Sequence, residues 1–268
     1  AVLEAGAPAS DVIGGFNELP DQGPEFDLGR NLDRVMRVYE SLPEGMRAVI
    51  TPWVAEMTRG MAIYSHRQAG PDGIHALLTA ADLERYCFFV AGTVGHLLTG
   101  LFLEALPGLS DERVRTMRRN AESFALGLQL VNILKDVTDD LERSWCFVPR
   151  SHLADAGIGP ADLTDPSARA AAHQAVVPVF ERAGEVLDEA FEYTLALPPE
   201  AREIRLFCLL PLWMAVRTLV LARGNDNQFI TGQKVKISRE EVGSLINDCV
   251  QRCQDDDALR AGYAALRN

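Results

Sequence analysis

The stretch that decides the fold reads Gln129-Leu-Val-Asn132-Ile-Leu-Lys135-Asp136-Val-Thr-Asp139-Asp140. At 100° per residue, the polar positions 129, 132, 136, 139 and 140 share one helix face covering about a third of the circumference. The residues between them are mostly apolar. We therefore predict a helix whose flanks are buried and whose polar stripe is narrow, the inverse of an ordinary surface helix.

This stripe offers the oxygen ligands that Mg²⁺ prefers, since magnesium takes one or two carboxylates and completes its shell with water and substrate phosphate. The candidate metal ligands are Asp136, Asp139, Asp140, Asn132 and Gln129. Lys135 lies beside them and can hold a phosphate oxygen as a point charge. Three carboxylates near the end of a helix oppose its dipole, which favours a metal site. The residues alone leave a solvated acidic patch as the alternative.

Outward from this stretch, the pattern is helical almost everywhere. Proline and glycine turns delimit helices expected over 28–42, 46–67, 80–105, 111–143, 168–197, 201–223, 238–254 and 257–266. Residues 1–27 are expected to be an irregular lead-in. Lys234–Ser238 alternates like a strand but is too short and isolated to found a sheet. The prediction is a single all-α domain over 1–268.

Composition restricts the partners and the compartment. The chain has 268 residues, 47% of them hydrophobic, and a formal net charge of −12, which repels nucleic acid and anionic lipid. An anionic substrate could bind only where the negative potential of the protein is reversed locally. A cation held by carboxylates would supply that reversal. Five scattered cysteines argue against a disulfide framework and for a reducing, cytoplasmic setting. No signal-peptide pattern opens the chain, and we expect no transmembrane segment.

Four blocks of sequence resemble the squalene/phytoene synthase family, in that family's order and over roughly residues 30–240. Gln129–Asp140 resembles its second aspartate-rich motif, and Cys-Phe-Val-Pro149 its F/Y-x-P ending. Tyr86-Cys-Phe-Phe-Val-Ala-Gly-Thr-Val-Gly95 is similar to its Y-C-x-x-V-A-G-x-V-G signature. Phe207-Cys-x-x-Pro211 and Val235–Arg239 match its C-terminal blocks. Together these matches are highly specific.

The resemblance implies an isoprenoid synthase fold, with helices around a central apolar cavity. It also implies that Asp136 and Asp140 hold Mg²⁺ on a diphosphate, with Asp139, Asn132 and Gln129 in support. The metal would stabilise the departing diphosphate and leave an allylic cation. Tyr86 matches the family's active-site tyrosine, placed to steer proton loss or to stabilise the cyclopropylcarbinyl intermediate.

Further residues are expected to bind substrate. Val90, Val94 and Leu98 continue from Tyr86 at helical spacing as a tunnel wall for the isoprenoid tail, with ordinary core packing as the alternative. Phe207 joins them from the C-terminal block. The family uses the block containing Lys236 and Arg239 near the diphosphates, and in squalene synthases near NADPH; a solvated turn is the alternative here.

Gly92 and Gly95, in the same block as Tyr86, are expected to let a neighbouring helix approach closely.

The chain departs from the family's pattern in two places. The first aspartate-rich motif is not found, and the alignment puts residue 1 just after its expected end, so the family's N-terminal helices are missing from this sequence. We expect the natural protein to supply that motif upstream of residue 1. Ser144-Trp145 stands where the family more often has Gly-Arg, which removes a basic residue.

The expected function is a transferase that condenses two prenyl diphosphates head to head. Farnesyl diphosphate is preferred over geranylgeranyl diphosphate, and the product is squalene, presqualene diphosphate or a phytoene-like hydrocarbon. Mg²⁺ is the expected cofactor, with NADPH if squalene is formed, and peripheral membrane association would serve product release.

Two alternatives stay open. Asn132-x3-Asp136-x3-Asp140 superficially resembles the metal triad of a class I terpene cyclase of the same architecture, although the block at Tyr86 argues against it. A non-catalytic family member could act as an assembly or lipid-binding partner.

Overall fold

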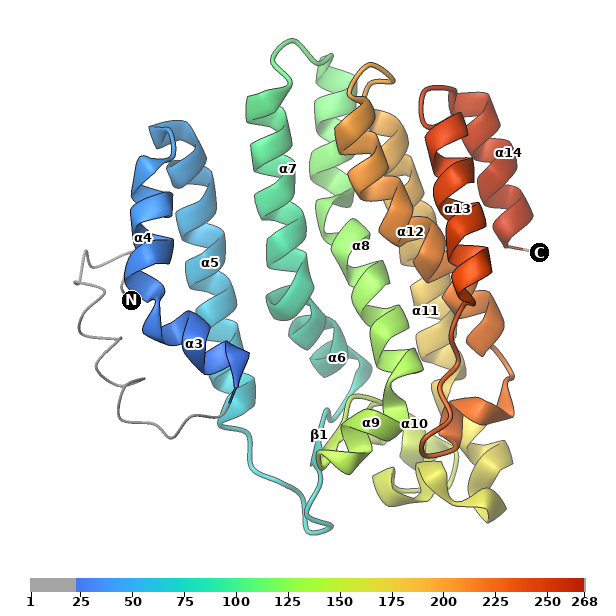
Figure 1. Cartoon of the computed structure of the whole chain (residues 1–268). Helices are drawn as coiled ribbons and strands as arrows, with labels where there is room; N and C mark the ends of the chain where they lie inside the picture. Colours follow the sequence, from blue (N-terminus) through green and yellow to red (C-terminus); the bar gives the residue numbers. More distant parts are fainter. Residues whose placement is uncertain (1–22, 268) are drawn as a thin grey trace.

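The computed structural model describes residues 23–267, and these form an all-α fold, as predicted (Figure 1). The longer helices are α4 (Leu32–Ser41), α5 (Glu44–Ser65), α6 (Ala80–Cys87), α7 (Thr93–Ala105), α8 (Asp111–Lys135), α11 (Arg169–Ala196), α12 (Arg202–Ala222), α13 (Arg239–Arg252) and α14 (Asp256–Leu266). The shorter ones are α3 (Pro24–Arg30), α9 (Val137–Glu142) and α10 (Arg150–Asp155), with 3₁₀ turns at Pro160–Thr164, Pro166–Ala168 and Asp226–Phe229.

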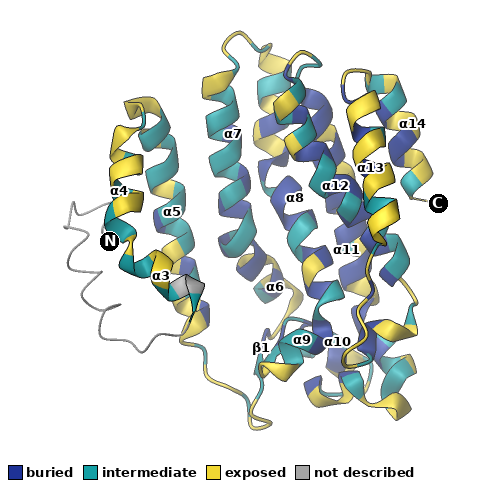
Figure 2. Cartoon of the chain, viewed as in Figure 1, coloured by how far each residue is buried: buried dark blue, intermediate teal, exposed yellow. Residues whose placement is uncertain are grey.

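Helix α8 lies at the centre of the bundle and packs against α11, α7 and α12 (Figure 1). The apolar residues that interrupt its polar stripe are buried: Leu130, Val131, Ile133 and Leu134 are each at most 4% exposed. Asn132, between them, is exposed. Figure 2 shows the same division, with buried residues concentrated on α8 and α11. The predicted inverse amphipathic helix is therefore confirmed.

Several local predictions are wrong. The helix expected over 111–143 is interrupted at Asp136, whose φ of −107° and ψ of 17° end α8 before α9 begins. Residues 24–27 of the expected irregular lead-in belong to α3, and residues 1–22 lie outside the described part. Lys234–Ser238 forms no strand, which agrees with the expectation that it founds no sheet, and Val235 is buried between two exposed lysines.

The structure also contains a short parallel pair that the sequence did not predict. Strand β1 (His75–Ala76) pairs with β2 (Trp145–Cys146), with His75 opposite Trp145. The amide of His75 donates to the Ser144 carbonyl at 2.9 Å, and that of Leu77 to the Cys146 carbonyl at 3.2 Å. This pair ties the α5–α6 connection to the segment that follows α9, at the lower end of the bundle in Figure 1.

Two helical stretches of the described chain, Ala80–Ala105 and Arg202–Ala222, are long and apolar enough to cross a membrane, judged by length and composition. The sequence interpretation expected no transmembrane segment, and these two stretches are candidates for one. Within the structure, 39% of the most apolar window of the first stretch and 50% of that of the second are buried. Core helices of soluble proteins meet the same criteria, so this is weak support for a membrane span.

Close helix packing depends on Gly95 of α7, as the sequence suggested. At Gly92, the other glycine expected to allow a close approach, an added Cβ would lie 3.1 Å from the Glu122 side chain of α8. A Cβ atom added at Gly95 would lie 2.0 Å from the Ala121 carbonyl oxygen of α8. Since that obstacle is backbone, no side-chain rotation can relieve it. On the other side of α7, a Cβ at Gly100 would meet Val49 of α5 at 2.5 Å. Helix α7 is thus held tightly between α5 and α8.

We expect Gly95→Ala to destabilise the protein by about 3 kcal/mol, because α7 and α8 must move apart to admit the methyl group. The matched control is Gly243→Ala on α13, where an added Cβ meets nothing within 4 Å. That substitution should be neutral or stabilise by up to about 1 kcal/mol through helix propensity. Urea unfolding of both variants measures the difference, and equal effects would contradict the close α7–α8 contact.

Candidate active site

The polar stripe of α8 opens onto a cavity of about 590 Å³. Its lining comes from α6, α8, α9, the segment after β2 and the loop before α13: Tyr86, Gln129, Asn132, Ile133, Lys135, Asp136, Asp139, Asp140, Arg143, Phe147 and Lys234. The structure therefore brings together all five predicted metal ligands with Tyr86 and Lys135.

The helix break at Asp136 changes the electrostatics of these carboxylates. Asp139 and Asp140 lie in the first turn of α9 rather than at the end of one long helix. Backbone N–H groups at a helix start favour negative charge, so the expected opposition between these two carboxylates and a helix dipole is wrong. The amide of Asp140 donates to the Asp136 carbonyl at 2.9 Å, which keeps the two residues one turn apart.

The surroundings of Asp140 disfavour its ionised form, although Arg143 lies 3.9 Å away and offsets part of the effect. The Asp140 side chain is 17% exposed. Burial, and then the neighbouring negative charge of Asp136, raise the pKa of Asp140 to about 6. A site that disfavours its own negative charge is suited to a cation.

The donor set fits Mg²⁺ rather than a metal held wholly by protein. Among the described residues, no group of three or more His, Cys, Asp or Glu side chains is placed to hold a metal ion. Asp136 and Asp140, with the amides of Gln129 and Asn132, offer fewer charged ligands than such a group. Mg²⁺ usually binds one or two carboxylates and takes its remaining ligands from water and phosphate.

Lys234 is a residue of this cavity that the sequence interpretation missed. It forms an ion pair with Asp139 and lies 3.9 Å from an oxygen of Asp136. The hydrogen bond from Lys234 lowers the pKa of Asp139. On the other side, the ammonium of Lys135 lies 2.9 Å from Asp136. The sequence held a weak signal, since the alternation of Lys234 and Lys236 puts both on one side of an extended segment.

The two basic residues predicted from the C-terminal block lie outside the cavity lining. Lys236 is exposed, and its charge adds a smaller contribution to lowering the pKa of Asp139. Arg239 is the exposed first residue of α13. Their expected contact with diphosphate stays a prediction.

Tyr86 stands between the polar cavity and a second, aromatic one. The second cavity has a volume of about 240 Å³ and is lined by Met61, Tyr64, Ser65, Tyr86, Asp140, Arg143, Trp145 and Phe147. Tyr86 is 8% exposed, and burial raises the pKa of its hydroxyl to about 12. Within residues 23–267, that hydroxyl has no hydrogen-bond partner, so it is available to a ligand.

The predicted tunnel residues lie away from these two cavities. Val90, Val94 and Leu98 are half-buried on one helical segment, but a π-helical turn, Phe88–Gly92, interrupts their regular spacing. Such turns insert one extra residue and are frequent at functional sites. Phe207 on α12 is 54% exposed and packs edge-on against Phe102, with ring centroids 6.1 Å apart. A role for these residues in binding a hydrocarbon tail stays a prediction.

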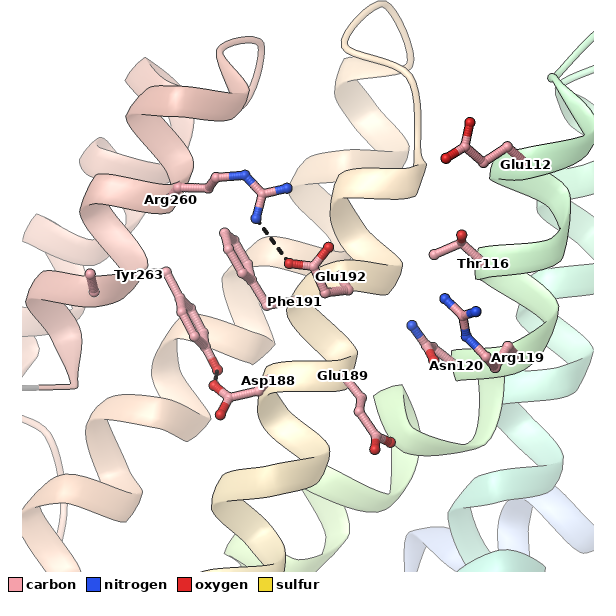
Figure 3. Close-up of a pocket in the computed structure, with 11 residues that line it drawn as sticks. Glu112, Thr116, Arg119, Asn120, Asp188, Glu189, Phe191, Glu192, Arg260 and Tyr263 are labelled. Atoms are coloured by element: carbon pink, nitrogen blue, oxygen red, sulfur yellow. Dashed lines mark hydrogen bonds and ion pairs between the residues drawn. The ribbon is translucent and has the colours of Figure 1, made fainter.

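A larger cavity of about 1010 Å³ lies elsewhere, between α8, α11 and α14 (Figure 3). Several of its charges are already paired. Arg260 lies 2.9 Å from Glu192, and Tyr263 donates to Asp188 at 2.9 Å. Arg267 also binds Asp188. These contacts attach α14 to α11, and they make the hollow a weaker candidate for chemistry than the carboxylate cavity.

Comparison with known proteins finds squalene synthases among the relatives of this chain. The family model for squalene/phytoene synthase matches residues 11–241. Squalene synthase of Schizosaccharomyces pombe is 31% identical over 221 residues, which cover 82% of this chain and 47% of the relative. Botryococcus squalene synthase of Botryococcus braunii is 29% identical over 231 residues, covering 83% and 46%. The chain thus spans about half the length of these relatives.

Solved structures show the same fold. The complex of TcSQS with the ligand BPH1237 aligns with a TM-score of 0.78 at 24% identity, covering 99% of this chain and 78% of that chain. A dehydrosqualene synthase in complex with a ligand aligns with a TM-score of 0.59 at 19% identity, covering 95% and 76%. At these identities the likeness concerns the fold alone.

The opposite pKa shifts of Asp140 and Asp139 predict opposite effects of neutralising them. Asp140 has a folded pKa of about 6, above its ordinary value of 3.8, so its ionisation destabilises the fold as pH rises from about 4 to 6. Without added metal, Asp140→Asn should therefore stabilise the protein by about 1–2 kcal/mol at pH 7.5. This advantage should disappear below pH 4.

Asp139→Asn is the matched control. The lowered pKa of Asp139 means that its ionised form stabilises the fold above its ordinary pKa, and that this contribution is lost as pH falls through the folded value. The variant should thus be less stable than the parent at neutral pH and equal to it in acid. Unfolding curves from pH 3 to pH 8 measure both. The same sign for both variants at pH 7.5 would contradict the derived electrostatics.

Proposed function

The chain belongs to the squalene/phytoene synthase family, and from that premise we propose that it joins two prenyl diphosphates head to head with the help of Mg²⁺. Farnesyl diphosphate is the preferred substrate in this proposal, and geranylgeranyl diphosphate the alternative. Squalene synthases among the relatives support the shorter chain. Because the chain spans about half of their length, the activity of the whole protein is part of the proposal.

One observation carries this proposal: Tyr86 and Asp140 line both the polar cavity and the aromatic one. A prenyl diphosphate is likewise divided into a polar and an apolar part, because its anionic diphosphate is joined to an allylic hydrocarbon. The head would lie over the carboxylates and lysines, and the first carbons of the chain beside the rings. The bond that must break would then lie near Tyr86.

Asp136 and Asp140 would hold the metal, and the amides of Gln129 and Asn132 would support it. When bound, Mg²⁺ supplies charge stabilisation for the departing diphosphate. Its charge would also relieve the penalty that burial and Asp136 impose on ionised Asp140. Lys135 and Lys234 would donate to phosphate oxygens, with Lys234 exchanging its present contact with Asp139.

Tyr86 would act after the diphosphate departs. With a pKa of about 12 its hydroxyl keeps its proton at neutral pH, so it is a hydrogen-bond donor rather than a base. It can hold an anionic oxygen or steer the place of proton loss while its ring shields the cation from water. Its free hydroxyl and its burial support this role.

NADPH would be needed if the product is squalene. We also propose a reducing, cytoplasmic setting, because all five cysteines are unpaired and buried. Peripheral contact with a membrane would receive the apolar product.

Incubating the protein with farnesyl or geranylgeranyl diphosphate tests the proposal. Each reaction is run with and without Mg²⁺ and NADPH, and the products are identified by mass spectrometry. A C30 or C40 head-to-head product that requires Mg²⁺ is the expected result. Cyclic terpenes would instead indicate a cyclase, and binding without consumption a non-catalytic partner.

Asp136→Asn and Asp140→Asn should each abolish turnover and weaken Mg²⁺-dependent binding of a non-hydrolysable prenyl thiodiphosphate. Both carboxylates line the same cavity, and losing either removes half of the charged ligands proposed for the metal. Glu142→Gln, on an exposed residue of α9 outside the cavity lining, is the control and should behave like the parent. Near-normal turnover in either aspartate variant would refute the proposed metal site.

Tyr86→Phe should bind substrate about as well as the parent but turn it over roughly 10²-fold more slowly, the scale typical of acid–base assistance. The melting temperature should barely move, because the ring survives and the hydroxyl has no partner within the described residues. Tyr39→Phe, on α4 and outside both cavities, is the control for turnover and should keep the kcat and KM of the parent. A large rise in KM with unchanged kcat would mean that Tyr86 only positions substrate.

A further inference from the structure

Four aromatic rings form a column that ends at Tyr86. His75 stacks on Trp145 with ring centroids 4.9 Å apart and an interplanar angle of 18°. Trp145 stacks on Phe147 at 5.6 Å and 13°, and Phe147 stacks on Tyr86 at 4.7 Å and 27°. The column crosses from the α5–α6 connection through β2 to α6, so its members come from three separate parts of the chain.

Both ends of the column are fastened to one ion pair. At one end, Nδ1 of His75 donates to the Arg67 carbonyl at 2.8 Å. The guanidinium of Arg67 binds both carboxylate oxygens of Asp82, at 2.5 and 2.8 Å. At the other end, the Tyr64 hydroxyl donates to Asp82 at 3.1 Å, and the Tyr64 ring meets Tyr86 edge-on at 5.1 Å.

The backbone reinforces this arrangement. The β1–β2 pair puts His75 directly opposite Trp145. Trp145 and Phe147 are two residues apart along an extended segment, so their side chains lie on the same side of it. The rings of His75 and Trp145 are therefore placed by backbone pairing, independently of Tyr86.

The two middle rings line the aromatic cavity, but stacking leaves them little ring face for a ligand. Phe147 stacks on both Trp145 and Tyr86. Trp145 stacks on both His75 and Phe147. A cation–π contact needs an open ring face. The column thus offers support for the ring at its inner end rather than a second surface for a cation.

We propose that Trp145 is a positioning residue for Tyr86, acting through Phe147. It holds the Tyr86 ring in the orientation that points its unpartnered hydroxyl at the junction of the two cavities. This inference rests on the proposed function, since it assigns a role toward that reaction. Small misplacements of a catalytic group are costly, and a loosened column would leave the reactive cation open to water.

The test compares Trp145→Leu with Trp145→Phe, which keeps a ring in the column. Trp53→Leu is a matched control, because Trp53 also stacks on a histidine, His96, at 4.5 Å and 11°, but outside both cavities. Three quantities are measured with farnesyl diphosphate and Mg²⁺: kcat, KM and the fraction of consumed substrate released as prenyl alcohol.

Trp145→Leu should lower kcat about tenfold, leave KM within about twofold and raise the alcohol fraction. Trp145→Phe should recover most of the loss, and Trp53→Leu should change none of the three. Loss of folded protein alone would lower kcat without changing the alcohol fraction. If Trp145→Leu does not fold, His75→Leu replaces it, because it removes the outer ring of the column and leaves the cavity lining intact; a smaller change in the same direction is then expected.

A double variant tests whether Trp145 acts through Tyr86. In a Tyr86→Phe background, Trp145→Leu should cause less than a twofold further loss of kcat, because the hydroxyl to be positioned is already gone. A full additional tenfold loss would overturn the inference while leaving the proposed function intact. So would parent-like kinetics in both Trp145→Leu and His75→Leu. A parent protein that consumes no prenyl diphosphate would refute the proposed function, and this inference with it.

Discussion

The burial of α8 on both flanks is the constraint on which the rest of the structure depends. With α11, α7 and α12 packed around it, the C-terminal half of α8 can expose only a narrow strip of its surface. The polar residues therefore share that strip because every other direction is occupied by core. The contact of Gly95 with the α8 backbone adds to this constraint, since at that point α7 lies too close to α8 to admit a side chain.

The carboxylates of the cavity carry an electrostatic cost that the protein offsets only in part. Asp140 is half-buried beside Asp136, and its raised pKa records that cost. Lys135 and Lys234 offset part of it by pairing with Asp136 and Asp139. Such trade-offs between stability and function are common where a site must hold charges that its ligand later compensates. The chain has a net charge of −12, so the two lysines at this cavity make the local charge less negative than the chain's overall charge would suggest.

Three departures from regular structure lie near the same region of the fold. The break at Asp136 separates α8 from α9, the π-helical turn begins two residues after Tyr86, and the β1–β2 pair holds Trp145 opposite His75. Local irregularity is tolerated here because the surrounding helices are tightly packed, and it is concentrated where ligand contact is expected.

Helix periodicity, the turn residues and the order of the motifs were readable from the sequence, because each depends on neighbours within a few positions. They yielded the all-α fold, the inverse amphipathic pattern of α8 and the residues that share its polar face. The tertiary structure alone decided the break at Asp136, the contact of Lys234 with Asp139 and the aromatic column from His75 to Tyr86. The last two join residues far apart in the chain, and local propensity carries no information about which distant side chains will meet. Arg239 lies outside the cavity lining for a similar reason. A sequence motif can identify a residue, but the path of the loop before α13 decides where that residue lies.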